Sequence, residues 1–498
     1  MKISKCLLFL SAITIVFSDP SSDCLLPIPG LNYDAWWGPE ELRELQDTSI
    51  RPFQVNFTNE TSPYNLPHPF ATITDELAVI ALNHITERIL SQYTTSPQMT
   101  LDLLYRLKHR RQLIPSLEGV WFEYGINSDV VEEWLTYWEN DYNFKYREKV
   151  LNSVPHYKTN VQGLDIHFVW AKPQVLDHIQ VVPLLLLNGW PSSFVEFLEV
   201  IPRLVAPDAH REFAVEVISP SLPGFTLSEG TTRPGLSAVD MAVIFRNLMH
   251  RLGHHEYYVQ GGDFGSMVAN GLATLFPQEV LGYHTNLPYL LSLPARLPSL
   301  ASLLIPDMGN SIYAGNNTKG RTSEDNIQQL AYLYYQSTKS DTLGMALNES
   351  PTGLLAYLLE KFHFGSVLDR RENAGARLDS IMPRDKVLDT ITLYWMTRSI
   401  TTSMRIYAEV FNRRTFAMNI DEIRTPVPTW VLEAKYEISG FSTGTLQNKY
   451  PNLIQHRTLE YGGHFLPIEL PEMFSNDVLD AITAFRSWHI RNKRRNEL

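Results

Sequence analysis

The chain contains 498 residues, 44% of them hydrophobic, and its formal net charge is −12 at pH 7. This length is enough for one large α/β domain with additions, or for two to three domains, and the ordinary composition excludes the disordered and fibrous classes. The acidic balance argues against a nucleic-acid partner, because a phosphate backbone requires a basic protein surface.

The first segment, residues 1–18, is expected to direct the chain into the secretory pathway. Lys2 and Lys5 precede an apolar run from Cys6 to Phe17, which is shorter than the roughly 20 residues needed to cross a bilayer. A charged start, a short apolar run and the small Ser18 are typical of a cleavable signal peptide; the alternative is an uncleaved N-terminal anchor. Four N-glycosylation sequons agree with this route, at Asn56, Asn59, Asn316 and Asn348, the last weakened by Pro351.

Cysteine usage is low. The sequence contains only Cys6 and Cys24, so removal of a signal peptide would leave Cys24 alone. We therefore expect no internal disulfide and no cysteine-based metal site in the mature chain.

Residues 25–150 are expected to form a helical N-terminal extension. Apolar residues recur at helical spacing in two stretches, "DELAVIALNHITERILSQY" (75–93) and "DVVEEWLTYWENDYNF" (129–144). No alternation of strand, turn and helix is visible in this region.

Residues 151–285 have the pattern of an α/β core. Alternating or continuous apolar runs predict strands, and an amphipathic stretch predicts a helix between them. Strands that alternate with helices indicate a parallel sheet. The stretches are "LDIHFVWAK", "VVPLLLLNGWP", "FAVEVISPSLPGF", "MAVIFRNLMHRLG" and "YYVQGGDFGSMVANGLATLFP".

The strands stop between residues 286 and 405, where segments such as "IQQLAYLYYQST" and "TGLLAYLLEKF" predict a helical lid inserted into the core. Residues 406–490 are expected to complete the core. There, "TPVPTWVLEAKYE" and "LIQHRTLEYGGHF" predict strands, and "MFSNDVLDAITAFRSWHIRNK" predicts a closing helix.

The last residues, 491–498, form a basic tail that ends in Arg-Asn-Glu-Leu. This ending resembles retrieval signals of the KDEL type with two positions changed; the alternative is a basic, solvated helix end. A signal peptide together with retrieval would place the protein in the lumen of the endoplasmic reticulum. Without retrieval the protein would be secreted, and membrane association stays possible.

A sharp turn between a strand and a helix is predicted at Asp263. Gly261-x-Asp263-x-Gly265 has the spacing of a nucleophile elbow, in which small residues permit a strained turn that presents one side chain above the sheet. Such a spacing alone is more often a plain turn. The preceding strand and the following helix favour the elbow here.

Two backbone amides are candidates for stabilising an oxyanion. In folds with such an elbow, the donors are the amide after the nucleophile and one from the loop after an earlier strand. Here these are the amides of Phe264 and of Trp190, in the sequence Asn188-Gly189-Trp190-Pro191. The alternative for this loop is a simple turn that ends a strand.

A base and an acid follow in the chain order nucleophile, acid, histidine that this arrangement has. His464 lies between glycines and Phe465 after the last predicted strand, and is the candidate base. Glu433 and Glu437 both follow the strand "PTWVL" closely enough to orient it. We favour Glu437, because Glu433 falls where the strand would still be running.

These motifs together resemble the epoxide hydrolases, most closely the microsomal branch that includes the juvenile hormone epoxide hydrolases. The resemblance rests on "GGDFGS", "GWPSSFVEF", "PSLPGFTLSE" and "GGHFLPIELPE", and extends over nearly the whole chain. It implies an α/β-hydrolase fold with a mostly parallel sheet, a helical lid and a helical N-terminal extension. It also implies Glu437 as the acid.

The resemblance further implies two lid tyrosines that hold the epoxide oxygen. They match Tyr332 in "LAYLYYQSTK" and Tyr407 in "MRIYAEV", although Tyr334 and Tyr335 lie close to the first. Two positions depart from the family pattern. Asn188 replaces the usual His, and Phe264 replaces the Trp usual in this branch; neither change removes a catalytic group if the donors are backbone amides.

A carboxylate nucleophile is suited to opening strained rings and to displacing halides from carbon. It is ionised at neutral pH, so it can attack carbon without an activating base. The expected reaction converts a hydrophobic epoxide and water to a vicinal diol through an ester on Asp263, with no metal or organic cofactor. The alternatives are a haloalkane dehalogenase and a catalytically inactive binding protein. The identity of the epoxide and the oligomeric state are left open.

Overall fold

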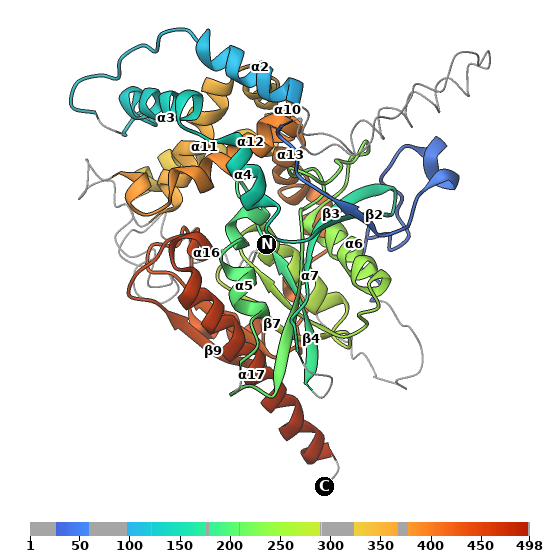
Figure 1. The fold of residues 1–498 in the computed structure, drawn as a ribbon. Helices are drawn as coiled ribbons and strands as arrows, with labels where there is room; N and C mark the ends of the chain where they lie inside the picture. Colours follow the sequence, from blue (N-terminus) through green and yellow to red (C-terminus); the bar gives the residue numbers. More distant parts are fainter. Residues whose placement is uncertain are drawn as a thin grey trace, which may run out of the picture.

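The computed structural model describes residues 26–58, 97–120, 122–175, 179–208, 210–288, 290, 323–366 and 377–496. The expected signal peptide, two sequons (Asn59 and Asn316) and the helix expected over 75–93 lie outside these residues. Among the described residues a nine-stranded sheet forms the centre of the molecule, in the order β1-β2-β3-β5-β4-β6-β7-β8-β9 (Figure 1). The strands are β1 (Arg51–Phe53), β2 (His156–Val161), β3 (Leu164–Ala171), β4 (Gln180–Leu187), β5 (Phe213–Pro220), β6 (Tyr257–Gly261), β7 (Val280–Thr285), β8 (Thr429–Glu433) and β9 (Leu453–Thr458).

The sheet is mostly parallel, which confirms the expected fold class. From β5 across to β9 neighbouring strands run parallel, whereas β1, β2 and β3 join antiparallel at one edge. The reason for the antiparallel edge is local. Gln162 and Gly163, with φ of 49° and 90°, form a two-residue turn between β2 and β3, and such a turn returns the chain antiparallel. Strands β1, β2 and β7 are not among the strands predicted from the sequence.

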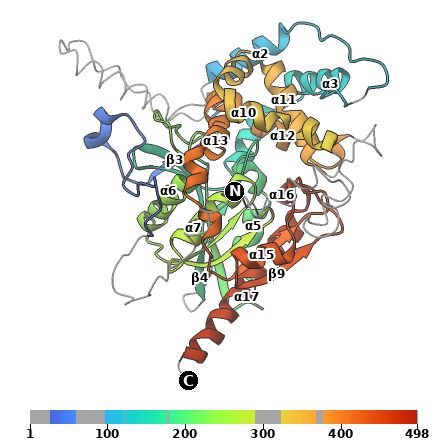
Figure 2. The same ribbon diagram turned by 180° about the vertical axis from the view of Figure 1, so that it is seen from behind.

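Helices cover both faces of the sheet, as a parallel sheet requires. Helices α6 and α7 pack against each other on one face, and α5 and α17 pack together on the other (Figures 1 and 2). All of α7 is buried, which explains its apolar composition on every side. The bounds are η3 (Phe194–Phe197), α5 (Val200–Val205), α6 (Ala238–Arg251), α7 (Phe264–Leu275), α15 (Thr443–Lys449), α16 (Leu466–Glu469) and α17 (Pro471–Asn496).

A group of helices between β7 and β8, which we call the helical insert, packs over the strand ends. It consists of α10 (Ser323–Glu349), α11 (Pro351–Gly365), η5 (Leu378–Ser380), α12 (Arg384–Thr397), α13 (Ile400–Val410), α14 (Arg413–Ala417) and η6 (Ile420–Glu422). Helix α13 runs across position 405, the end expected for the lid. Helices α10 and α13 approach closely at Gly344, where an added Cβ would lie 2.4 Å from the Thr401 hydroxyl.

The N-terminal segment packs against the helical insert. It contains η1 (Glu40–Leu45), α2 (Pro97–Lys108), α3 (Ser128–Asn140) and α4 (Phe144–Leu151). Helices α2 and α3 lie beside α11 in both views (Figures 1 and 2). The contact between the N-terminal segment and helix α12 of the insert includes a buried polar network. The Asp389 carboxylate, fully buried on α12, accepts hydrogen bonds from the Tyr142 hydroxyl at 2.7 Å and from Nε of Arg147 at 2.9 Å.

We expect Asp389→Ala to destabilise the protein by about 3–5 kcal/mol, because it removes the carboxylate that contacts the buried Arg147 guanidinium most closely and leaves only Asp385, at 3.6 Å. Urea unfolding followed by tryptophan fluorescence would measure this. The matched control is Asp341→Ala, which removes an exposed ion pair with Arg405 and should cost less than about 1 kcal/mol. Equal losses in the two variants would contradict the importance of the buried network.

Candidate active site

Asp263 lies on a strained turn between β6 and α7. Its φ of 50° and ψ of −127° are rare for a residue with a side chain. The flanking glycines are required by sterics. A Cβ at Gly261 would lie 2.2 Å from the Gly265 carbonyl oxygen, and a Cβ at Gly265 would lie 2.3 Å from the Leu187 carbonyl oxygen. The turn therefore holds the carboxyl group above the ends of the parallel strands.

Both amides identified in the sequence contact this carboxyl group. The Trp190 amide donates to Oδ1 of Asp263 at 2.8 Å, and the Phe264 amide also donates to the carboxylate. Gly189 makes room for this contact, because a Cβ there would lie 2.2 Å from Oδ1. The neighbouring Asn188 is buried, and its side-chain nitrogen Nδ2 donates to the Gly189 carbonyl oxygen at 3.1 Å.

His464 lies between Asp263 and Glu437. Its Nδ1 is 2.6 Å from Oε1 of Glu437, and its Nε2 is 3.7 Å from Oδ2 of Asp263. The other candidate acid, Glu433, has a different partner: its Oε2 is 3.3 Å from Nε2 of His456, and its Oε1 accepts a hydrogen bond from the backbone. Of the two candidate acids, therefore, Glu437 is the one beside His464.

Burial and charge act in opposite directions on these groups. Burial raises the pKa of Asp263, while His464 and the two amides lower it. Burial lowers the pKa of His464, but the carboxylates of Glu437 and Asp263 outweigh this effect and raise the pKa of His464 to about 9. At neutral pH the histidine is therefore protonated and lies between two carboxylates.

Two tyrosines of the helical insert face this group. Tyr407 on α13 is buried, and its ring lies 4.7 Å from the ring of Phe264 and 5.6 Å from that of Trp190. Tyr332 on α10 lies 6.0 Å from both Trp190 and Tyr407, measured between ring centroids. Burial, the Tyr332 hydroxyl and the Asp263 charge hold the pKa of Tyr407 well above its ordinary value, so its hydroxyl remains a donor.

The adjacent tyrosines point elsewhere. Tyr334 and Tyr335 are 71% and 47% exposed, whereas Tyr332 packs against Trp190 and Tyr407. Tyr332 is therefore the member of this cluster that lies at the candidate site.

Sequence reasoning missed several groups near the site. Glu196 on η3 is buried, and burial raises its pKa to about 8, with His464 and the Ser192 hydroxyl acting in the opposite direction. Lys361 on α11 places its Nζ 4.5 Å from the ring centre of Tyr332. The stretch "GWPSSFVEF" contains Glu196, but nothing in its local pattern indicates that the carboxyl group is buried.

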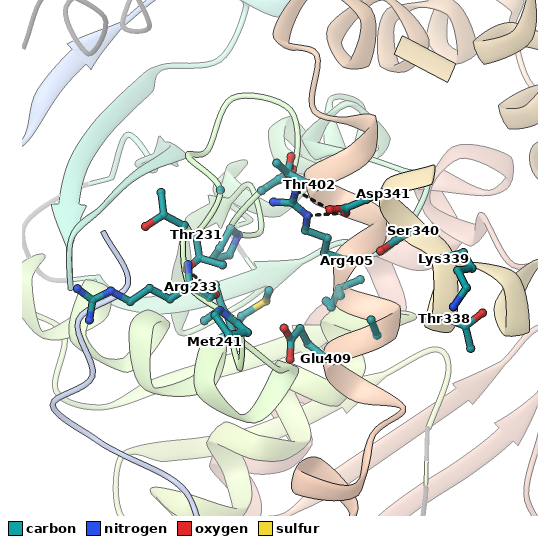
Figure 3. Close-up of a pocket in the computed structure, with 18 of the residues that line it drawn as sticks. Thr231, Arg233, Met241, Thr338, Lys339, Ser340, Asp341, Thr402, Arg405 and Glu409 are labelled. Atoms are coloured by element: carbon teal, nitrogen blue, oxygen red, sulfur yellow. Dashed lines mark hydrogen bonds and ion pairs between the residues drawn. The ribbon is translucent and has the colours of Figure 1, made fainter. Parts of the chain in front are cut away.

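A cavity of about 550 Å³ lies between α10, α13 and the loop from Pro223 to Leu236 (Figure 3). Arg405 on α13 and Asp341 on α10 form an ion pair at its wall, with Nε 2.8 Å from Oδ1. None of the seven site residues expected from the sequence lines this cavity.

Comparisons with known proteins identify the family. Residues 91–197 match the model of the epoxide hydrolase N terminus, and residues 182–341 match that of the α/β hydrolase fold. A juvenile hormone epoxide hydrolase of Bombyx mori is 42% identical over 468 residues, which cover 92% of each chain. The chain belongs to the epoxide hydrolase family.

Other relatives agree with this assignment. Epoxide hydrolase 1 of Sus scrofa is 34% identical to this chain over 458 residues, which cover 89% of this chain and 91% of the relative. The crystal structure of the Bombyx mori juvenile hormone epoxide hydrolase superposes with a TM-score of 0.79 and covers 92% of this chain and 100% of that one. The Aspergillus niger epoxide hydrolase, 23% identical with a TM-score of 0.62, shares the fold.

We expect Glu437→Gln to lower the pKa of His464 below its value of about 9 in this epoxide hydrolase, because the largest favourable charge beside the imidazole is lost. Titration of the histidine by nuclear magnetic resonance would measure the change. Glu433→Gln is the matched control, since Glu433 contacts His456 instead. The same fall in both variants would contradict the pairing of Glu437 with His464.

Proposed function

We propose that this epoxide hydrolase converts hydrophobic epoxides to vicinal diols through an ester on Asp263, with His464 as base, Glu437 as its orienting acid, and Tyr332 and Tyr407 as donors to the epoxide oxygen. The observation that carries this proposal is the different surroundings of the two oxygens of Asp263. Oδ1 accepts the Trp190 amide at 2.8 Å, while Oδ2 faces Nε2 of His464 at 3.7 Å. We infer that Oδ2 is the attacking atom and that Oδ1 becomes the ester carbonyl oxygen.

Ring opening is the first step. Oδ2 of Asp263 attacks one ring carbon, the carbon–oxygen bond breaks, and the departing oxygen receives hydrogen bonds from Tyr332 and Tyr407. A proton from one tyrosine neutralises the alkoxide. Esterification removes the negative charge of Asp263 that had raised the pKa of His464, so the imidazolium then loses its proton more easily and restores the tyrosine.

Hydrolysis of the ester is the second step. Neutral His464, oriented by Glu437, takes one proton from water, and the resulting hydroxide attacks the carbonyl carbon of Asp263. The amides of Trp190 and Phe264 stabilise the oxyanion on Oδ1. The intermediate collapses, the second water proton goes to the leaving alkoxide, and the diol departs. Asp263 is again a carboxylate and His464 is again protonated, so the cycle balances.

The substrate we propose is a hydrophobic epoxide. The rings of Tyr332, Tyr357 and Tyr407 each lie about 6 Å from the ring of Trp190, whose amide contacts Asp263, and these rings provide an apolar surface. We propose that the helical insert acts as the lid over this surface. Juvenile hormone is the first epoxide to assay, because relatives 36–42% identical carry its name.

We infer that the protein enters the secretory pathway and that the endoplasmic reticulum is its location. The charged and apolar start, the Arg-Asn-Glu-Leu ending and the relatedness to the juvenile hormone and mammalian epoxide hydrolases support this. Within the described ranges, no helix combines the length and apolarity needed to cross a membrane. Asn348 is poorly suited to glycosylation, because its side-chain nitrogen donates to the Thr401 hydroxyl at 2.7 Å.

A single turnover in heavy-oxygen water, with enzyme in excess over stilbene oxide, tests the ester mechanism. We expect an unlabelled diol and heavy oxygen on the peptide that carries Asp263, because water attacks the carboxyl carbon. Mass spectrometry of both products would measure this, with Asp263→Asn as the control that forms no ester. Label that enters the diol directly would exclude Asp263 as the nucleophile.

We expect Tyr407→Phe to slow ester formation by about 100-fold, because it removes a donor to the developing alkoxide. Tyr332→Phe should act in the same direction. Rapid-quench measurement of the ester would give the rates. The control is Tyr334→Phe on the same helix, whose side chain is 71% exposed and which should leave the rate unchanged. A Tyr334 effect as large as that of Tyr332 would contradict the assignment.

A further inference from the structure

The loop that carries His464 is held from the core side by a buried carboxyl group. Glu469, at the end of α16, accepts the Gly463 amide at 3.0 Å on Oε2, and it also accepts the Phe465 amide. These two amides belong to the residues on either side of His464. The mechanism proposed above gives Glu469 no part in the chemistry.

The same loop is held from the other side by the helical insert. The His464 amide donates to the carbonyl oxygen of Gly365, the last residue of α11, at 2.7 Å. A Cβ at Gly365 would lie 2.7 Å from the Phe465 ring and 3.2 Å from Cβ of His464. The end of α11 is therefore packed directly on the backbone of the candidate base, and the rings of Phe362 and Phe465 extend this contact at 4.7 Å.

Gly463 shows that the two contacts meet at one point. A Cβ there would lie 2.6 Å from the Gly365 carbonyl oxygen and 2.8 Å from Oε1 of Glu469. The backbone beside His464 is therefore packed closely against both groups, and a shift of Gly365 or Glu469 is expected to move it. Such a shift would change the 2.6 Å contact to Glu437 and the 3.7 Å separation from Asp263.

We propose that Gly365 and Glu469 are positioning residues for His464, so that the end of helix α11 in the insert is part of the support of the catalytic base. This inference rests on the proposed function. It assigns to both residues an effect on ester hydrolysis, where His464 must abstract a proton from water. Ring opening depends on the carboxylate of Asp263, which the Trp190 and Phe264 amides hold, and on the tyrosines of α10 and α13.

The protonation state of Glu469 allows the effects of its packing and of its charge to be tested with separate substitutions. Burial and the nearby Glu437 raise the pKa of Glu469 to about 8, against the effect of the two amides and of His464. The carboxyl group is therefore mostly protonated at neutral pH, and a glutamine is a close substitute that keeps an acceptor for the two amides. A leucine fills similar space but accepts no hydrogen bond.

Four variants test the proposal by rapid-quench single turnover with stilbene oxide at pH 7, with the ester on the Asp263 peptide followed by mass spectrometry. We expect Glu469→Leu and Gly365→Ala to slow ester decay by about 10- to 100-fold, the range that a small misplacement of a catalytic group produces. Ester formation should change by less than about threefold in both, so that the ester accumulates. Glu469→Gln should stay close to the parent.

The matched control is Gly353→Ala in the first turn of the same helix, where an added Cβ meets only Ser350 at 3.5 Å or more and should change neither rate. Equal slowing of both steps in Glu469→Leu and Gly365→Ala, or an unchanged decay rate in both, would overturn the proposal. If Glu469→Leu fails to fold by circular dichroism, Gly365→Ala decides alone. Absence of any ester in the parent would instead refute the proposed function.

Discussion

The hydrogen bond from the Trp190 amide to Oδ1 of Asp263 is the contact on which the rest of the site depends. It joins the loops after two adjacent parallel strands, β4 and β6, and it forms only because Gly189, Gly261 and Gly265 allow the backbones to approach. It stabilises the carboxylate at a position where burial alone would favour the protonated acid. It also gives the two oxygens of the Asp263 carboxylate different surroundings.

Charge at this site is limited by burial. One imidazolium, His464, lies between the carboxylates of Asp263 and Glu437, while two further carboxyl groups nearby, Glu196 and Glu469, have a pKa of about 8. The second pair is therefore mostly neutral at pH 7, which avoids four adjacent negative charges in a region of low dielectric constant. In the proposed mechanism, ester formation would remove the charge of Asp263, which is one of the charges that raise the pKa of His464.

The surrounding helices hold these groups in place from several directions. The N-terminal helices contact the insert through the buried Asp389 network, and the insert contacts the histidine loop through Gly365. The insert also supplies Tyr332 and Tyr407 from helices α10 and α13, which approach closely at Gly344. Segments that are far apart in the chain therefore all contribute to positioning the residues of the candidate site.

Local sequence was enough to predict the α/β core, the turn at Asp263 and the positions of Trp190, Phe264 and His464 at strand ends, because glycine spacing and apolar periodicity act over a few residues. Two features depended on contacts between distant segments. Tyr332 packs against the aromatic residues of the site whereas Tyr334 and Tyr335 are exposed, and the carboxyl groups of Glu196 and Glu469 are buried near His464. A pattern within one segment specifies its own turn or helix, but which neighbours surround a side chain, and hence its pKa and partners, is specified by how the segments pack.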